Sequence, residues 1–225
     1  MTSRLRKLGP VACLVVALGI AASASVAYAA TLSVTSARLT TYSVAVTIDP
    51  TVCTLTPVAD ATVDRNAATT NFGNLTTLSV RRQASNRQKR SLVRFNVASC
   101  GIPGTAQIVS SSLRMTVITP PGSNQSYGAH RITGGAWVEG TVTYNTQPAS
   151  AAAATSTVAT GASPTSLTWS VLADVDAYVK GTAVNNGWVI RDAAETSNPA
   201  VETVFGSRQN GTAGNRPSLV ISYYP

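Results

Sequence analysis

A cluster of basic residues is the most chemically informative feature of the sequence. It consists of Arg81, Arg82, Arg87, Lys89, Arg90 and Arg94. A guanidinium group can donate two parallel hydrogen bonds to a carboxylate or a sulfate, so a row of arginines on one sheet face would bind a polyanion. The alternative is a solvated basic face that keeps the protein soluble.

The segments that carry these residues have the alternation of β-strands. In SLVRFNV, Val93, Phe95 and Val97 share one face, and SSLRMTVIT alternates in the same way. If the strands on either side of QASNRQK pair as a hairpin, Arg81 and Arg94 can lie on one face. Three more arginines lie on the polar faces of other expected strands: Arg114, Arg131 and Arg191.

Turn signals such as Pro120-Pro121-Gly122 and Asn186-Gly187 separate many short strands. This pattern predicts an all-β fold, a two-sheet antiparallel β-sandwich with jelly-roll-like connections. One short helix is expected near 174–180, capped by Asp174 and stopped by Gly181. The low-complexity segment 149–166 predicts an exposed loop or a poorly formed edge strand.

The first 29 residues have the pattern of a secretory signal peptide. Arg4, Arg6 and Lys7 precede an apolar run that ends in Ala27-Tyr28-Ala29. Its removal would lower the basic residues from 17 to 14 against nine acidic ones, and would leave no membrane span. The expected organisation is a signal peptide (1–29), an extension that can form strands (30–56) and a sandwich domain (57–225).

Cleavage would also remove Cys13 and leave an even pair, Cys53 and Cys100. A secreted chain with two cysteines predicts a disulfide between them. Two buried free thiols are the alternative.

Catalytic chemistry has few candidates. His130 is the only histidine, which excludes multi-histidine metal centres, and the chain has nine acidic residues. In GGAWVEGTVTYNTQPA, Trp137 and Glu139 are either a sugar platform beside an acid or parts of the framework. Asp60, Asp64 and Asn71 offer oxygen ligands for structural calcium, although no EF-hand spacing is present, and the alternative for them is turn formation.

From Ala59 to Pro225 the chain resembles the DNRLRE-domain family of secreted β-sandwich modules. The motifs that carry the likeness are ADATVD, TNFGN, SLVRFNV, IPGTAQIVSSSLRM, WVEGTVTYNTQP, DVDAYVKG, NNGWVIRD and RPSLVISYYP. The resemblance implies a non-catalytic module related to carbohydrate-binding modules, some of which bind acidic polysaccharide. It also implies a framework role for Trp137, Glu139, Asp174 and Trp188.

The leading hypothesis is a secreted or cell-surface protein that recognises acidic polysaccharide or cell-wall glycan through its arginines, without catalysis. The first alternative is a structural or adhesive surface protein that associates with itself, and the second is a small polysaccharide-degrading enzyme. Nucleic acid is not an expected partner, because aromatic residues do not interleave with the basic run. No cofactor is expected apart from calcium.

Overall fold

The computed structural model describes residues 15–18, 30–33, 45–46 and 48–225. The predicted signal peptide therefore lies outside the described residues except for 15–18, and Cys13 lies outside them too. The chain divides into two compact units, Met1–Asp49 and Pro50–Pro225. In the first unit, β1 (Val15–Leu18), β2 (Ala30–Ser33) and β3 (Ala45–Val46) form an antiparallel sheet in that order.

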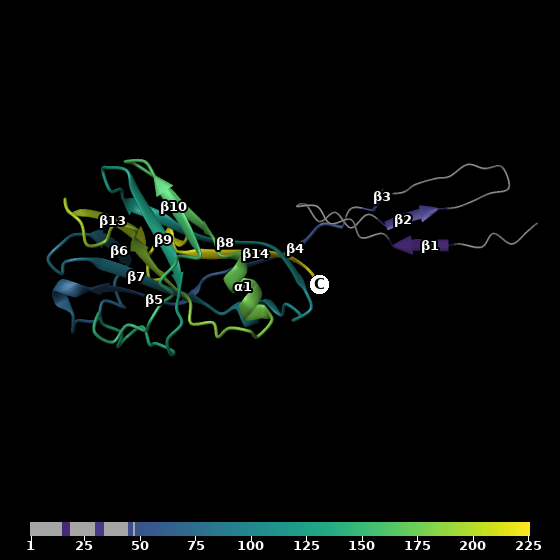
Figure 1. Cartoon of the computed structure of the whole chain (residues 1–225), viewed down its shortest axis with the longest axis horizontal. Helices are drawn as coiled ribbons and strands as arrows, with labels where there is room; N and C mark the ends of the chain where they lie inside the picture. Colours follow the sequence, from purple (N-terminus) through teal and green to yellow (C-terminus); the bar gives the residue numbers. More distant parts are fainter. Residues whose placement is uncertain (1–14, 19–29, 34–44, 47) are drawn as a thin grey trace, which may run out of the picture. The chain divides into compact units, whose positions relative to one another are not determined.

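The second unit is almost entirely antiparallel β-structure, which confirms the predicted fold class (Figure 1). Its strands are β4 (Thr51–Leu55), β5 (Pro57–Asp64), β6 (Thr77–Arg82), β7 (Lys89–Phe95), β8 (Gln107–Thr119), β9 (Gln125–Arg131), β10 (Ser156–Thr160), β11 (Ser166–Ser170), β12 (Trp188–Asp192), β13 (Val201–Gly206) and β14 (Ser218–Tyr224). They follow the order β10-β9-β12-β7-β6-β13-β8-β14-β4, with β11 paired to β8 and β5 paired to β7. The sheet curls on itself into a β-sandwich.

The main core lies on the inner face of this curled sheet. Strand alternation supplies it: on β14, Leu219, Ile221 and Tyr223 are buried while the residues between them are half-buried. β8 contributes Leu113 and Met115 in the same way. The facing strands add the large side chains Phe95, Tyr127, Trp188, Ile190 and Phe205.

β4 belongs to the sandwich unit, although its residues precede the domain start expected at 57. It pairs with β14, from Thr51 opposite Tyr223 to Leu55 opposite Leu219. Cys53 on this strand forms a disulfide with Cys100, at the end of the 3-10 helix η2 (Val97–Cys100). The covalent link therefore closes a loop of 47 residues.

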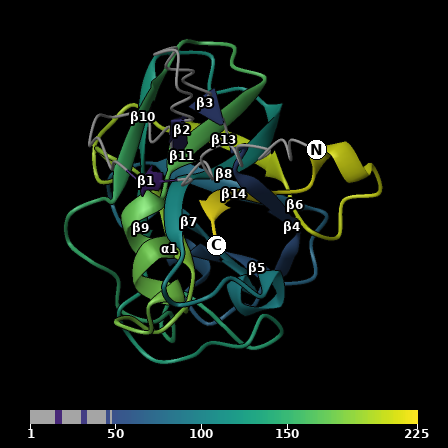
Figure 2. The ribbon, with the colours of Figure 1, turned by 90° about the vertical axis from the view of Figure 1, so that its right-hand side faces the viewer.

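The one α-helix among the described residues, α1 (Leu172–Val179), is labelled in Figure 2 and packs against β8 and η2. It begins two residues before Asp174, and its N-cap is Val171, which makes no side-chain cap hydrogen bond. The expectation that Asp174 caps the helix was wrong, because its carboxylate accepts a hydrogen bond from Trp188 Nε1 at 2.7 Å instead. Gly181 follows the helix with φ of 69°, as a stop residue does. Among the described residues no helix is long and apolar enough to cross a membrane.

The low-complexity segment 149–166 contains β10 and ends at the first residue of β11. β10 ends the strand order beside β9, and β11 pairs with β8 from Ser166 opposite Thr116 to Ser170 opposite Ser112. Two further 3-10 helices, η1 (Arg65–Ala67) and η3 (Ala213–Asn215), complete the regular structure.

Candidate functional site

A long loop, residues 133–149, covers part of the outer face of the sheet. After Glu139 it runs through turns and forms no strand before Gln147. Its Trp137 and Val142 are buried in a second apolar cluster with Ala61, Leu92 and Val189 of the sheet. The Trp137 side chain is only 4% exposed, and its Nε1 donates to the carbonyl of Asn186 at 2.9 Å. The indole is therefore packed inside the protein and does not present a stacking surface for a sugar.

Glu139 anchors this loop through several hydrogen bonds. Its carboxylate accepts from Arg208 at 2.6 Å through both Nε and Nη2, from the backbone N–H of Asp60 at 3.0 Å and from Gln209 at 3.0 Å. Burial raises the pKa of Glu139, but these donors outweigh burial and hold the pKa below its ordinary value. Glu139 is therefore an ionised structural group with its oxygens already engaged.

The residues considered as calcium ligands have other partners. The Asn71 amide donates to the carbonyls of Glu139 at 2.8 Å and Val142 at 2.7 Å, which fixes the loop. Asp64 accepts from the backbone N–H of Asn66 and lies within ion-pairing distance of Arg81 and Lys89. In the part of the chain that the structure describes, no group of three His, Cys, Asp or Glu side chains is placed to hold a metal ion.

Asp60 is almost completely buried, and its Oδ2 accepts from the backbone N–H of Arg208 at 2.6 Å. Burial raises the pKa of its carboxyl to about 7, with a further increase from Glu139 and opposing contributions from Arg208. This carboxyl therefore titrates near neutral pH in the folded protein.

Arg81 and Lys89 face each other on β6 and β7 and share acidic partners. Lys89 Nζ lies 2.9 Å from Glu202, and Arg81 lies 3.7 Å from Glu202 and 3.6 Å from Asp64. Since Arg94 is five residues beyond Lys89, strand alternation directs it to the opposite face. β6 and β7 do pair as a hairpin, with Arg81 opposite Lys89, but Arg81 and Arg94 lie on opposite faces of it.

Two more basic residues are neutralised within the fold. Arg90 binds Glu195 through Nε at 2.8 Å, and its guanidinium lies 5.6 Å from the centre of the Tyr144 ring. Arg131 lies 3.7 Å from the Asp174 carboxylate. Because these two side chains are paired with carboxylates, little of their charge is available to a ligand.

The remaining predicted residues are dispersed. Arg87 is exposed in the turn before β7, and its carbonyl accepts from Arg81 Nε at 2.6 Å. Arg114 is exposed in the middle of β8, on the other layer. Arg82 ends β6, where it interacts electrostatically with Asp192. The structure therefore does not gather the predicted basic residues into one face.

Arg94 differs from Arg81, Lys89, Arg90 and Arg131, which are paired with carboxylates. Within the described ranges it has no ion pair, and its guanidinium carbon lies 5.5 Å from the centre of the Trp137 ring. Its Nε is buried and has no hydrogen-bond partner there. Arg94 consequently keeps both its positive charge and a free donor.

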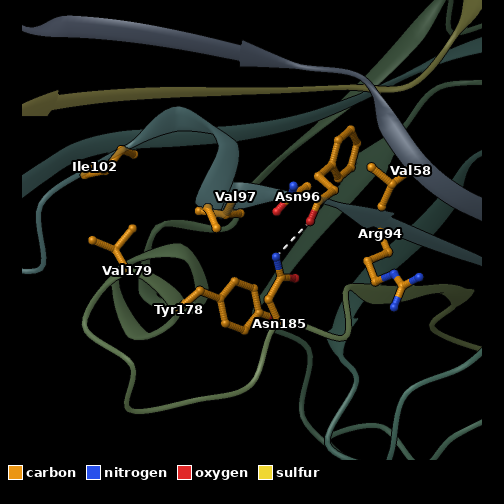
Figure 3. Close-up of a pocket in the computed structure, with 10 residues that line it drawn as sticks. Val58, Arg94, Asn96, Val97, Ile102, Tyr178, Val179 and Asn185 are labelled. Carbon is orange, nitrogen blue, oxygen red and sulfur yellow. Dashed lines mark hydrogen bonds between the residues drawn. The ribbon is translucent and has the colours of Figure 1, made fainter.

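Arg94 lines a pocket with a volume of about 580 Å³. Figure 3 shows Val58 and Arg94 on one side, Val97, Ile102 and Val179 on the other, and Tyr178 and Asn185 between them. The Asn185 amide donates to the carbonyl of Phe95 at 2.8 Å, which holds the loop after α1 against the end of β7. The walls are thus mainly apolar, with a few polar groups among them.

Two further polar atoms in this pocket are buried without a hydrogen-bond partner among the described residues, Tyr178 Oη and Asn185 Oδ1. Burial raises the pKa of the Tyr178 hydroxyl, and the Asp174 carboxylate raises it further, so the hydroxyl is neutral at physiological pH. A pocket with apolar walls and a few unpaired polar groups is the usual form of a small-molecule site.

Sequence reasoning missed Tyr178, Asn185 and Arg208. Tyr178 has the spacing of a core residue on a short helix, and Asn185 precedes a turn signal, so neither pattern indicates a ligand. Arg208 lies in a turn after β13, far in sequence from Glu139. Only the folded arrangement brings these residues to their partners.

Comparison with protein-family models gives a match to carbohydrate-binding module family 96 over residues 51–223. The match covers nearly the whole sandwich unit, from β4 to β14. A comparison with curated proteins finds no match.

Proposed function

This chain belongs to carbohydrate-binding module family 96, and from that premise we propose that it is a secreted, non-catalytic protein that binds acidic polysaccharide at the Arg94 pocket. Membership in the family supports the binding of carbohydrate. The anionic ligand, the site and secretion belong to the proposal.

The state of Arg94 is the observation that carries this proposal. Arg81, Lys89, Arg90 and Arg131 are all paired with carboxylates, whereas Arg94 has no such partner within the described residues. A uronate carboxylate would supply the missing acceptor through a charge-assisted hydrogen bond.

The rest of the pocket suits a sugar ring. Val58 is 47% exposed and offers apolar surface at the pocket wall, and the Tyr178 ring forms another part of the lining. Sugar C–H groups can pack against such surfaces, while Asn185 Oδ1 accepts a hydrogen bond from a hydroxyl. The mechanism is recognition on a preformed site without covalent chemistry.

The test is binding of the protein to a polyuronate and to the same polymer after chemical reduction of its carboxyl groups. Arg94→Gln should weaken binding to the polyuronate about ten- to hundredfold, because a charge-assisted hydrogen bond is lost. Arg114→Gln is the matched control, since it removes an exposed arginine from a distant part of the same unit. Equal binding of the Arg94→Gln variant and the unchanged protein would exclude this pocket.

The same experiment separates the alternatives. Absence of binding to either polymer would favour a structural or adhesive surface protein. New reducing ends or unsaturated products during incubation with the polyuronate would show an enzyme instead.

A further inference from the structure

A second, smaller pocket of about 260 Å³ lies at the other end of β12 from the Arg94 pocket. Arg82, Gln125 and Asp192 line it, and these residues end β6, begin β9 and end β12. Asn185 of the first pocket precedes the start of β12, so the strand runs from one pocket to the other. The two pockets share no lining residue.

Three side chains of this pocket each have a buried polar atom with no hydrogen-bond partner among the described residues. The atoms are Arg82 Nε, Gln125 Oε1 and Asp192 Oδ2. Gln125 and Asp192 are only 6% and 3% exposed. Buried polar groups are normally paired, so three unpaired groups in one small pocket require an explanation.

The other polar atoms of the two acceptor side chains fix their orientation. Gln125 Nε2 donates to Ser123 Oγ at 2.9 Å, and Asp192 Oδ1 accepts from the backbone N–H of Ala194 at 2.8 Å. The unpaired oxygens are therefore held in place by the fold, as binding groups are in a preorganised site.

The charges of the pocket define the class of ligand. Asp192 would repel a carboxylate or a sulfate, and Arg82 beside it would repel a metal cation. One donor and two acceptors match a neutral ligand that carries adjacent hydroxyl groups, since a hydroxyl both donates and accepts. We propose that this pocket binds a vicinal hydroxyl pair of a neutral sugar, as a second carbohydrate site separate from the Arg94 pocket.

In this arrangement one sugar hydroxyl donates to Asp192 Oδ2 and the other donates to Gln125 Oε1, while either accepts from Arg82 Nε. Burial raises the pKa of Asp192, although the Ala194 N–H and Arg82 oppose that increase. The hydroxyl donor would add to the stabilisation of the ionised carboxylate. The exposed Ala193 and Ala194 at the mouth are small and leave space for a sugar ring.

The experiment is a titration of the full ¹⁵N-labelled chain with the methyl glycosides of glucose, galactose and mannose, followed by amide chemical shifts. Shifts at 124–126 and 192–194 are expected with at least one of the three, because their hydroxyl pairs differ in orientation. Asp192→Asn should weaken that binding about ten- to hundredfold, since it removes the charged acceptor.

Two variants keep the test decisive. Ala193→Phe fills the mouth from an exposed position without altering the three binding side chains, so it should abolish the shifts even if Asp192→Asn fails to fold. Arg94→Gln should leave binding of the neutral glycoside unchanged, which separates this proposal from the one for polyuronate. The proposal is overturned if none of the glycosides shifts these amides, as would happen if water alone fills the pocket, or if Ala193→Phe binds like the unchanged protein.

Discussion

Arg208 forms a bidentate ion pair with Glu139, with Nε–Oε1 and Nη2–Oε2 distances of 2.6 Å each. The pair connects the turn after β13 to the loop 133–149, two segments that are 69 residues apart in sequence. It therefore holds the loop, with Trp137, over the outer face of the sheet.

Glu139→Gln is expected to lower the free energy of unfolding by about 1–2 kcal/mol, because it removes charge-assisted hydrogen bonds from a half-buried site. Chemical denaturation measures this change. Lys180→Ala is the matched control: it removes an exposed ion pair with Asp176, and it should change stability by no more than about 0.5 kcal/mol. Equal effects of the two variants would contradict the structural role of Glu139.

Asp60 predicts a pH dependence of stability. Its pKa is raised from an ordinary value of 3.8 to about 7 in the folded protein, so the folded state binds more protons than the unfolded state between these values. The contribution of Asp60 to the free energy of unfolding should consequently be greatest below pH 4 and should fall as the pH rises toward 7.

Asp60→Asn should remove that fall, because the amide does not ionise and its oxygen can still accept from the Arg208 N–H. Thermal melting from pH 4 to pH 8 compares the variant with the unchanged protein. Parallel pH profiles for the two proteins would show that another group is responsible.

Gly73→Ala should destabilise the protein because of a steric conflict. A Cβ at this position would lie 2.1 Å from the carbonyl oxygen of Glu139, whereas a Cβ at Gly140 meets nothing within 4 Å. We expect a loss of about 1–3 kcal/mol for Gly73→Ala and almost none for Gly140→Ala. Melting temperatures of the two variants test this, and a neutral Gly73→Ala would contradict the close approach of the loop.

Replacement of Cys53 and Cys100 by serine should lower the free energy of unfolding, because the unfolded chain without the cross-link has more conformational entropy. For a loop of 47 residues the chain-entropy estimate is about 4 kcal/mol. Denaturation with and without a reducing agent measures the effect in the unchanged protein, and the serine variant should then be insensitive to the reductant. A thiol count that finds both cysteines free in the unreduced protein would exclude the link.

The fold class follows from short-range patterns that the sequence displays directly. Alternation in the segments of β7, β8, β12 and β14 predicts their strands, because each buries one face in a shared core. The form of the loop 133–149 cannot be recognised from its own sequence. Its actual form depends on Asn71 and Arg208, which come from other parts of the chain.

The candidate site could be predicted only in part. A cluster of arginines in sequence indicates charge, but pairing with Glu195, Glu202 and Asp174 depends on strand register and tertiary contacts. Arg94 forms no ion pair among the described residues, and sequence spacing does not show this. The same holds for the unpaired atoms of Gln125 and Asp192.

The position of β12 between the two pockets has a consequence for how the protein would hold a polymer. Four residue steps separate Trp188 from Asp192, so the strand fixes a spacing of about 14 Å along its length. A heteropolysaccharide with both uronic and neutral sugars could then bind at both sites at once, because the strand holds them at a fixed distance. Binding at the first site would raise the effective concentration of the polymer at the second. Two sites near the two ends of one strand would in this way give avidity for mixed-composition chains over homopolymers.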